Sequence, residues 1–179
     1  MTKTQASVTI NAPMIKSDES NWHFLLVDKR TSRKLGFSDK EKFRRVLCSM
    51  RGGPKFHCAL MPWGDQFYII VNKKRREAIG AQAGDKVEIA LERDESKYGL
   101  PMPPEVKEVL KQDKEGNELF HGLSPGKQRS MLYWLSRTKD LDRRIHEALI
   151  FVEHLKKNDG KIDGRQLMEE MKRPSFGSS

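Results

Sequence analysis

The sequence predicts an α+β fold in which a small β-barrel is followed by a small helical bundle. Residues 1–97 contain β-branched and aromatic runs broken by Gly and Pro, which is typical of strands. Beyond residue 104, apolar residues recur every three or four positions, which is typical of helices. Between the two lies a segment with three prolines in four positions, at 101, 103 and 104. Because proline fits neither a helix interior nor a strand ladder, we predict a linker over residues 98–104.

Composition indicates a basic globular protein. The 179 residues include 34 Lys and Arg against 25 Asp and Glu, for a net charge of +9. The apolar runs at 67–71 and 148–152 are five residues long, whereas a membrane-spanning helix needs about 20. We therefore expect no membrane insertion. The first ten residues lack the apolar core of a secretory signal, so we expect a cytoplasmic protein.

The two cysteines agree with that compartment. Cys48 and Cys58 would be bridged in an oxidising environment, but a reducing cytosol favours two buried thiols. We expect Cys58 to belong to the core.

An internal repeat is the most informative feature of the N-terminal half. A shift of 44 residues lays residues 23–47 on residues 67–91. The identical pairs are Val27 and Val71, Lys29 and Lys73, Gly36 and Gly80, Lys42 and Lys86, and Leu47 and Leu91. Conservative pairs such as Leu25 and Ile69, or Phe43 and Val87, lie between them. We therefore predict an internal duplication, with repeats over about 8–51 and 52–95.

Each repeat is predicted to form a hairpin, a short helix and a third strand. In the second repeat we expect strands over 55–61, 66–71 and 86–93, a turn over 62–65 and a helix over 73–79 that Asn72 caps. In the first repeat the corresponding strands are 8–15, 22–27 and 42–50, and Asp28 is the cap. Half-buried strands need a partner sheet, which the other repeat supplies. We expect a closed or split barrel with pseudo-twofold symmetry within one chain, and hence a monomer.

The stretch VNKKRREAIGAQAGDKVEIALERD, residues 71–94, resembles the signature of AbrB/MazE-type swapped-hairpin barrels. It departs from their pattern at Lys73, where those proteins usually have proline. Because this chain supplies both halves itself, the resemblance implies a single-chain double-split β-barrel.

The whole chain, over about residues 8–172, resembles the YdeI/OmpD-associated family, which is named for bacteriocin protection and carries a small N-terminal domain of unknown function. The stretches that carry the likeness are LMPWGDQFYIIVNKKRREAIGAQAGDKVEIAL, YGLPMPPEVKEVL and LFHGLSPGKQRSMLYWLSRTKDLDRRIHEAL. The resemblance implies a bacterial protein linked to antimicrobial-peptide or envelope stress. It supplies no catalytic residues.

The C-terminal residues 105–173 are predicted to form the helical domain. We expect helices over 105–114, from Pro125, from Asp140 or Asp142, and over 166–172, with a short segment beginning at 117–120. The predicted apolar stripes are Met131, Leu132, Trp134 and Leu135 on one helix, and Ile145, Leu149, Val152 and Leu155 on the next. We expect residues 174–179 to form a disordered tail.

Motifs for metals and catalysis are incomplete. The pair His146-Glu147 opens like a zinc-protease helix, but Ile150 stands where the second histidine belongs. Residues 158–163 resemble part of a calcium loop, yet Leu155 and Lys157 occupy two ligand positions, which favours a helix-breaking turn. We therefore assign no catalytic, cofactor-binding or metal-binding residue, and expect no cofactor.

Basic clusters are the sharper functional signal. They form two groups that the repeat makes equivalent: Lys29, Arg30, Arg33 and Lys34, and Lys73, Lys74, Arg75 and Arg76. Paired basic patches suit a polyanion, and the aromatic residues Trp63, Phe67 and Tyr68 lie near the second. A charged run is more often a solvated face.

Three hypotheses follow. The first, which we favour, is a non-catalytic module that binds a protein or an anionic partner. The second is a nucleic-acid binder that uses the paired patches. The third is an enzyme with a site between barrel and bundle, where His121 or His146 would act.

Overall fold

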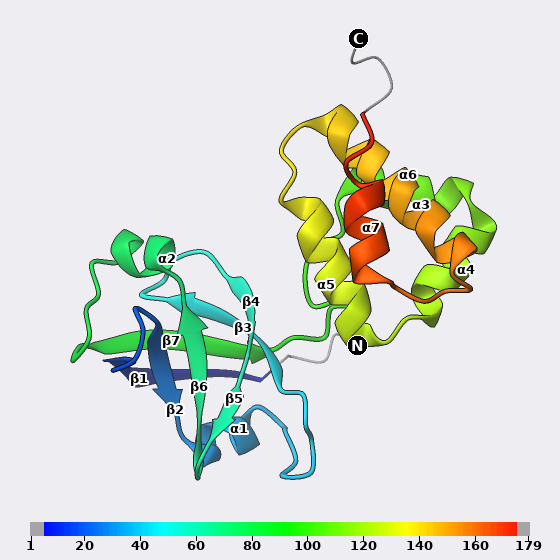
Figure 1. The fold of residues 1–179 in the computed structure, drawn as a ribbon. Coiled ribbons are helices and arrows are strands. Elements are labelled where there is room, and N and C mark those ends of the chain that lie inside the picture. The colour runs from blue at the N-terminus through cyan, green and yellow to red at the C-terminus, as the bar shows by residue number, and fades with distance from the viewer. Residues whose placement is uncertain (1–5, 175–179) are drawn as a thin grey trace. The chain divides into compact units, whose positions relative to one another are not determined.

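The computed structural model describes residues 6–174 and divides the chain into two compact units, residues 1–99 and 100–179 (Figure 1). The predicted disordered tail lies outside the described residues apart from Pro174.

The N-terminal unit contains seven strands and two short helices in its described part. They are β1 (Ser7–Lys16), β2 (His23–Val27), α1 (Lys29–Lys34), β3 (Arg45–Met50), β4 (Phe56–Ala59), β5 (Met61–Trp63), β6 (Gln66–Val71), α2 (Lys73–Ala78) and β7 (Lys86–Arg93). The strands form one antiparallel sheet in the order β4-β3-β7-β1-β2-β6-β5, which curls into a nearly closed barrel (Figure 1). This confirms the predicted barrel followed by helices.

The long strand β1 joins the two parts of the sheet. Its residues 7–13 pair with β7, and its residues 14–16 pair with β2. In the second half of the unit, two strands occupy the place that β1 occupies in the first: β4 pairs with β3, and β5 pairs with β6. Residue Leu60 separates them and is buried.

The registers of two strand pairs, β2 with β6 and β3 with β7, agree with the 44-residue shift found in the sequence. The register of β4 departs from it, because Val8 faces Leu91 but His57, rather than Gly52, faces Leu47. In the pair β2 and β6, Leu25 faces Ile69, the residue 44 positions further along the chain. At the ends of this pair, His23 faces Val71 and Val27 faces Phe67, so each end pair consists of the equivalents of the other. In the pair β3 and β7, the opposed residues also exchange under the same shift. The two halves thus hold equivalent places in the sheet, while their origin by duplication stays a prediction.

Alternate residues of the strands fill the barrel. Val87, Ile89 and Leu91 are fully buried, as their spacing predicts, and Leu25 and Ile69 meet them inside. Cys48 is buried in this core and Cys58 is half-buried, and both are free thiols. A hydrogen bond with Cys48, together with burial, raises the pKa of the Cys58 thiol, so Cys58 stays protonated.

Two expectations for this unit are wrong. Pro62 and Trp63 were expected in a turn, but they belong to β5, and the turn begins at Gly64. An edge strand tolerates Pro62 because its unpaired side needs no N–H donor. Phe43, the predicted equivalent of Val87, precedes β3 and is 78% exposed, so the likeness of the repeats does not extend to this position.

The C-terminal unit contains five helices in its described part: α3 (Pro104–Gln112), α4 (Lys114–Gly122), α5 (Pro125–Ser136), α6 (Leu141–Lys157) and α7 (Gly164–Glu170). The central helix α6 contacts each of the other four. The core of this unit contains Phe120 and Phe151, whose rings meet edge to face with their centroids 6.3 Å apart. The segment expected to begin near residue 117 is a full helix, which starts earlier because Asp113 caps it.

One predicted core position of this unit is wrong. Leu149 was placed on the buried stripe of α6 but is 45% exposed. The buried residues of α6 include His146, Ile150 and His154, so the buried arc is centred away from Leu149. Of the α5 stripe, Met131, Leu132 and Leu135 are buried as predicted, and Trp134 is half-buried.

A buried histidine joins the end of α6 to α7. His154 is fully buried, and its Nδ1 lies 2.8 Å from Oε2 of Glu170. The backbone N–H of Asp163 donates to Nε2 at 3.1 Å, so the ring proton resides on Nδ1 and is donated to Glu170. The turn at 158–163 is therefore fixed by hydrogen bonds, as its structural interpretation expects. Among the described residues, no helix is both long and apolar enough to cross a membrane.

Helix α4 packs closely against α6 at Gly116. A Cβ at this position would overlap Cγ1 of the buried Val152 on α6. We predict that Gly116→Ala lowers the free energy of unfolding by about 1–3 kcal/mol, because overpacking outweighs the better helix propensity of alanine. Denaturant unfolding followed by circular dichroism at the helical band measures it. Gly126→Ala, with open space around the new Cβ, is the control and is expected not to destabilise. Equal stability of both variants would contradict the close packing.

The ion pair between Asp113 and Lys156 makes this unit sensitive to acid. The hydrogen bond from Lys156, helped by the Gly116 N–H, holds the pKa of Asp113 below its usual 3.8. The stabilisation is thus present above about pH 4 and is lost as pH falls through the lowered pKa. Asp113→Asn keeps a capping side chain and removes the charge. We predict that the stability difference between wild type and Asp113→Asn shrinks between about pH 5 and pH 3. A difference that is constant over this range would show that the ion pair does not stabilise the unit.

Candidate anion-binding site

The basic clusters found in the sequence lie on the two short helices of the barrel. The carboxylate of Asp28 accepts the N–H of Thr31 at 2.6 Å and starts α1, and the side chain of Asn72 accepts the N–H of Arg75 at 2.8 Å and starts α2. Both helices end before a glycine with positive φ, at Gly36 and Gly80. Both N-cap residues were predicted from the sequence. Because the helix starts directly after its cap, each cap also determines where the run of cations begins.

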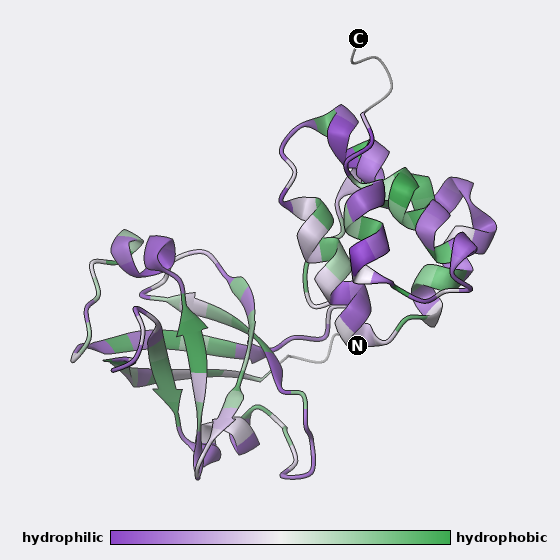
Figure 2. Cartoon of the chain, viewed as in Figure 1, coloured by the Kyte–Doolittle hydropathy of each residue, from purple (hydrophilic) through white to green (hydrophobic). Residues whose placement is uncertain are grey.

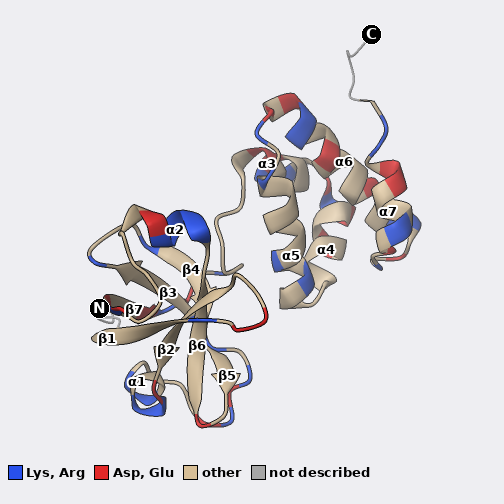
Figure 3. Ribbon diagram, turned by 60° about the vertical axis from the view of Figure 1, so that its left-hand side comes forward, with Lys and Arg blue, Asp and Glu red and all other residues tan. Residues whose placement is uncertain are grey.

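The structure does not bring the two clusters together. Helix α1 follows β2 and helix α2 follows β6, and these neighbouring strands run antiparallel. The helices therefore lie at opposite ends of the strand pair, as Figure 3 shows. The positions are equivalent, as the sequence predicts, but each cluster has its own surroundings.

One carboxylate contacts two of the four cations on α1. Nη2 of Arg33 donates to Asp39 at 2.9 Å, and Nζ of Lys29 lies 4.0 Å from the same carboxylate. The hydrogen bond from Arg33 holds the pKa of Asp39 below its usual value, so Asp39 stays ionised. Arg30 and Lys34 point to solvent. The α1 cluster is mainly a solvated face.

On α2, a described carboxylate lies close to one of the four cations rather than two. Lys73 lies 3.7 Å from Glu77, and both side chains are largely exposed. Lys74 makes no ion pair with any residue that the structure describes. The guanidinium of Arg75 lies over the ring of Phe56, 4.2 Å from its centroid. Arg76 is half-buried and donates to the carbonyl of Ala81 at 3.4 Å.

One side of α2 borders a cavity of about 320 Å³, which we call the α2 groove. Its floor is apolar and comes from the connection between β3 and β4 and from α2. The lining residues are Met50, Gly53, Pro54, Lys55, Phe56, Asn72, Lys74, Arg75, Ala78 and Ile79. Three of these ten are cations and none is acidic. Lys55 also contacts Glu92 at 2.6 Å, outside the lining. The α2 groove is therefore suited to an anionic group carried on an apolar body.

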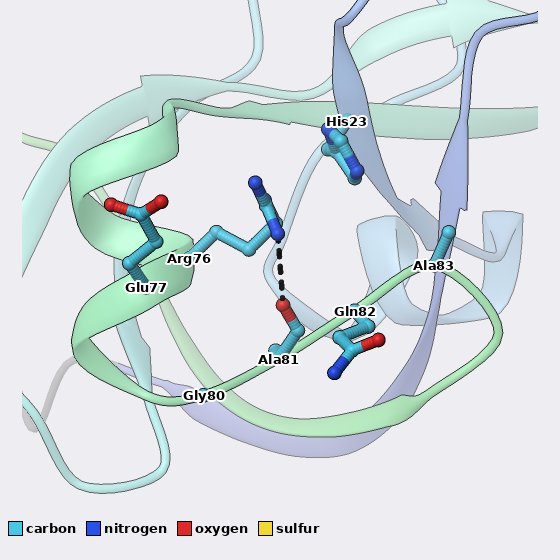
Figure 4. Close-up of a pocket in the computed structure, with 7 residues that line it drawn as sticks. All are labelled: His23, Arg76, Glu77, Gly80, Ala81, Gln82 and Ala83. Atoms are coloured by element: carbon cyan, nitrogen blue, oxygen red, sulfur yellow. Dashed lines mark hydrogen bonds between the residues drawn. The ribbon is translucent and has the colours of Figure 1, made fainter.

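The other side of α2 borders a second cavity of about 460 Å³ (Figure 4). It contains Arg76, Glu77, His23 and Gln82, and Figure 4 shows Arg76 reaching toward Ala81 between α2 and the following loop. Nε of Arg76 is buried without a hydrogen-bond partner in the described residues. Because Glu77 shares this cavity with Arg76, its charge is mixed. It is less suited to an anion than the α2 groove.

Sequence reasoning identified Lys74 and Arg75 but not Lys55 and Phe56. Lys55 and Phe56 lie near the start of the second repeat, well before α2, and no spacing in the sequence predicts that they contact this helix. The aromatic residues predicted to lie near the second cluster differ in their exposure. Phe67 is buried in the barrel, whereas Trp63 is 51% exposed.

The histidines that the enzyme hypothesis would use lie in the C-terminal unit and contact main-chain carbonyls. Nδ1 of His121 lies 2.8 Å from the carbonyl of Asn117, and Nε2 of the buried His146 lies 3.3 Å from that of Arg173. Within residues 6–174, no three His, Cys, Asp or Glu side chains are grouped so as to hold a metal ion.

Two family models match the chain. Residues 11–91 match a domain of unknown function, DUF1905, which covers the barrel from β1 to β7. Residues 100–158 match the family described as bacteriocin-protection, YdeI or OmpD-associated, which covers α3 to α6. No curated protein matches the chain significantly. The two models match separate parts of the chain in the order that the resemblance implies, which confirms the predicted likeness to the YdeI/OmpD-associated family with an N-terminal domain of unknown function.

Proposed function

We propose that the chain is a non-catalytic binding protein that holds an anionic group of its partner in the α2 groove. The observation that carries this proposal is the convergence of Lys55, Lys74 and Arg75 on one apolar cavity whose described lining contains no carboxylate. Cations around an apolar floor attract an anion and bury the apolar part attached to it. Arg75 is held in place by Phe56, so part of the site is organised before binding.

The description of the matching family names bacteriocin protection, and we propose that this binding serves protection against antimicrobial peptides. The net charge of +9 disfavours direct capture of a cationic peptide, because like charges repel. We therefore propose that the partner is an anionic protein or ligand, and that protection follows from binding rather than from catalysis.

Nucleic-acid binding through the paired clusters is a second candidate function. Its supporting observation is that α1 and α2 hold equivalent positions at the two ends of one strand pair, which would let both contact a single polyanion (Figure 3). The pairing of Asp39 with Arg33 weakens the contribution of α1.

The α2 groove is tested by titration of the full chain with phenyl phosphate, followed in ¹⁵N–¹H spectra. We expect shifts of amides in residues 53–56 and in α2. Inorganic phosphate, which lacks the apolar part, and benzyl alcohol, which lacks the charge, are each expected to bind more weakly. Lys74→Ala is expected to weaken phenyl phosphate binding about fivefold, the effect of losing one exposed charged contact of about 1 kcal/mol.

The matched control is Arg30→Ala, which removes the exposed cation at the equivalent position of α1 and is expected to leave the affinity unchanged. Shifts that avoid α2, or equal affinity of the Lys74→Ala variant and wild type, would contradict the site.

A further inference from the structure

The outer faces of the neighbouring strands β2 and β6 are apolar. Leu25, Val27 and Ile69 point into the barrel, so the residues between them point outward. Their partners across β1 and β5 continue the same rows, because Ile15 faces Phe24 and Met61 faces Tyr68. We call this surface the outer sheet face; its apolar residues are Ile15, Phe24, Leu26, Met61, Trp63, Tyr68 and Ile70, and the polar Gln66 lies opposite Trp63 at its edge.

An apolar outer face is unusual for a strand whose inner face already fills a barrel, since such strands normally alternate apolar and polar residues. Figure 2 shows β2 and β6 hydrophobic along most of their length. Trp63 is 51% exposed, Met61 41% and Ile70 40%, whereas Ile15, Phe24, Leu26 and Tyr68 are half-buried. Adjacent exposed apolar residues on this scale mark an interaction surface.

The aromatic residues on this face are neighbours. The rings of Phe24 and Tyr68 meet edge to face with centroids 5.0 Å apart, and Trp63 meets Tyr68 in the same way at 6.4 Å. They come from three adjacent strands, β2, β6 and β5. Trp22, 56% exposed, directly precedes β2. Strand-borne aromatic side chains of this kind are the surfaces on which unpaired bases stack in single-strand-binding domains.

The outer sheet face has no charged residue, but cations lie at both of its ends. Lys73 begins α2 directly after β6, and Lys29 and Arg30 begin α1 directly after β2. Figure 3 shows these blue segments at opposite ends of the strand pair. Carboxylates accompany these cations: Asp28 directly precedes Lys29, Asp39 lies 4.0 Å from Lys29, and Glu77 lies 3.7 Å from Lys73. Further acidic residues, Asp18, Glu19 and Asp65, lie in the hairpin turns rather than on the face.

We infer that the outer sheet face binds a single-stranded nucleic acid, with unpaired bases on Phe24, Tyr68 and Trp63 and phosphates at the helix cations. The six residues of β6 span about 20 Å, so one short segment of a flexible strand reaches from α2 to α1. A duplex hides its base faces and would gain little from the aromatic residues. This inference goes beyond the proposed function and uses a surface other than the α2 groove.

The test is fluorescence anisotropy of the full chain with a labelled oligothymidylate of about 15 nucleotides, and with the matching duplex, between about 50 and 200 mM salt. We expect the single strand to bind more tightly than the duplex, with an affinity that falls as salt rises. Trp63→Ala and Tyr68→Ala are each expected to weaken single-strand binding about 5- to 100-fold, the usual effect of removing one stacking partner.

The control is Tyr133→Ala, which removes a 62% exposed aromatic residue from α5 and is expected to leave the affinity unchanged. Unchanged thermal unfolding shows that each variant is folded. Absence of binding at 50 mM salt would overturn the inference and leave the face to a protein partner. So would duplex binding as tight as single-strand binding, or wild-type affinity in both aromatic variants. None of these outcomes changes the phenyl phosphate titration, so the two proposals fail separately.

Discussion

The antiparallel pairing of β2 with β6 is the constraint on which the N-terminal unit depends. With Leu25 opposite Ile69, one set of alternate residues fills the barrel and the other set forms an apolar outer surface. A slip of one residue would exchange the two sets. The same pairing sends the following helices to opposite ends, because each helix continues the carboxyl end of its own strand. The core, the outer sheet face and the separation of the basic helices all follow from this one register.

Equivalent positions in the barrel have acquired different chemistry. The two helices begin with matching caps, yet Asp39 holds two cations of α1, whereas α2 faces the apolar α2 groove with Lys74 and Arg75. The groove forms where Lys55, in the connection after β3, and Phe56, the first residue of β4, lie against α2. Charge on α2 is thus available for a partner. The C-terminal unit is organised differently: the central helix α6 contacts the other four helices, and the buried His154 hydrogen-bonds to Glu170 of α7.

The sequence predicts most of the elements but not the sites. Strands 66–71 and 86–93 agree with β6 and β7 at both ends, because each is a compact apolar pattern bounded by turn residues. Pro62 misled the local prediction, since only the sheet order shows that it lies on an edge strand. The spacing of Leu149 fits a helical stripe whether that stripe is buried or exposed, and in the folded unit the helices around α6 leave Leu149 exposed. Phe56 and Arg75 are far apart in sequence, so only the folded chain joins them.

The most direct test of this account is the β2 and β6 register in solution. Cross-strand nuclear Overhauser effects in the uniformly labelled chain report which residues face each other. The account predicts contacts between His23 and Val71 and between Val27 and Phe67, with Leu25 and Ile69 at the centre. Contacts displaced by one residue would turn over one of the two strands, placing either Phe24 or Tyr68 inside the barrel, and would contradict both the core and the outer sheet face.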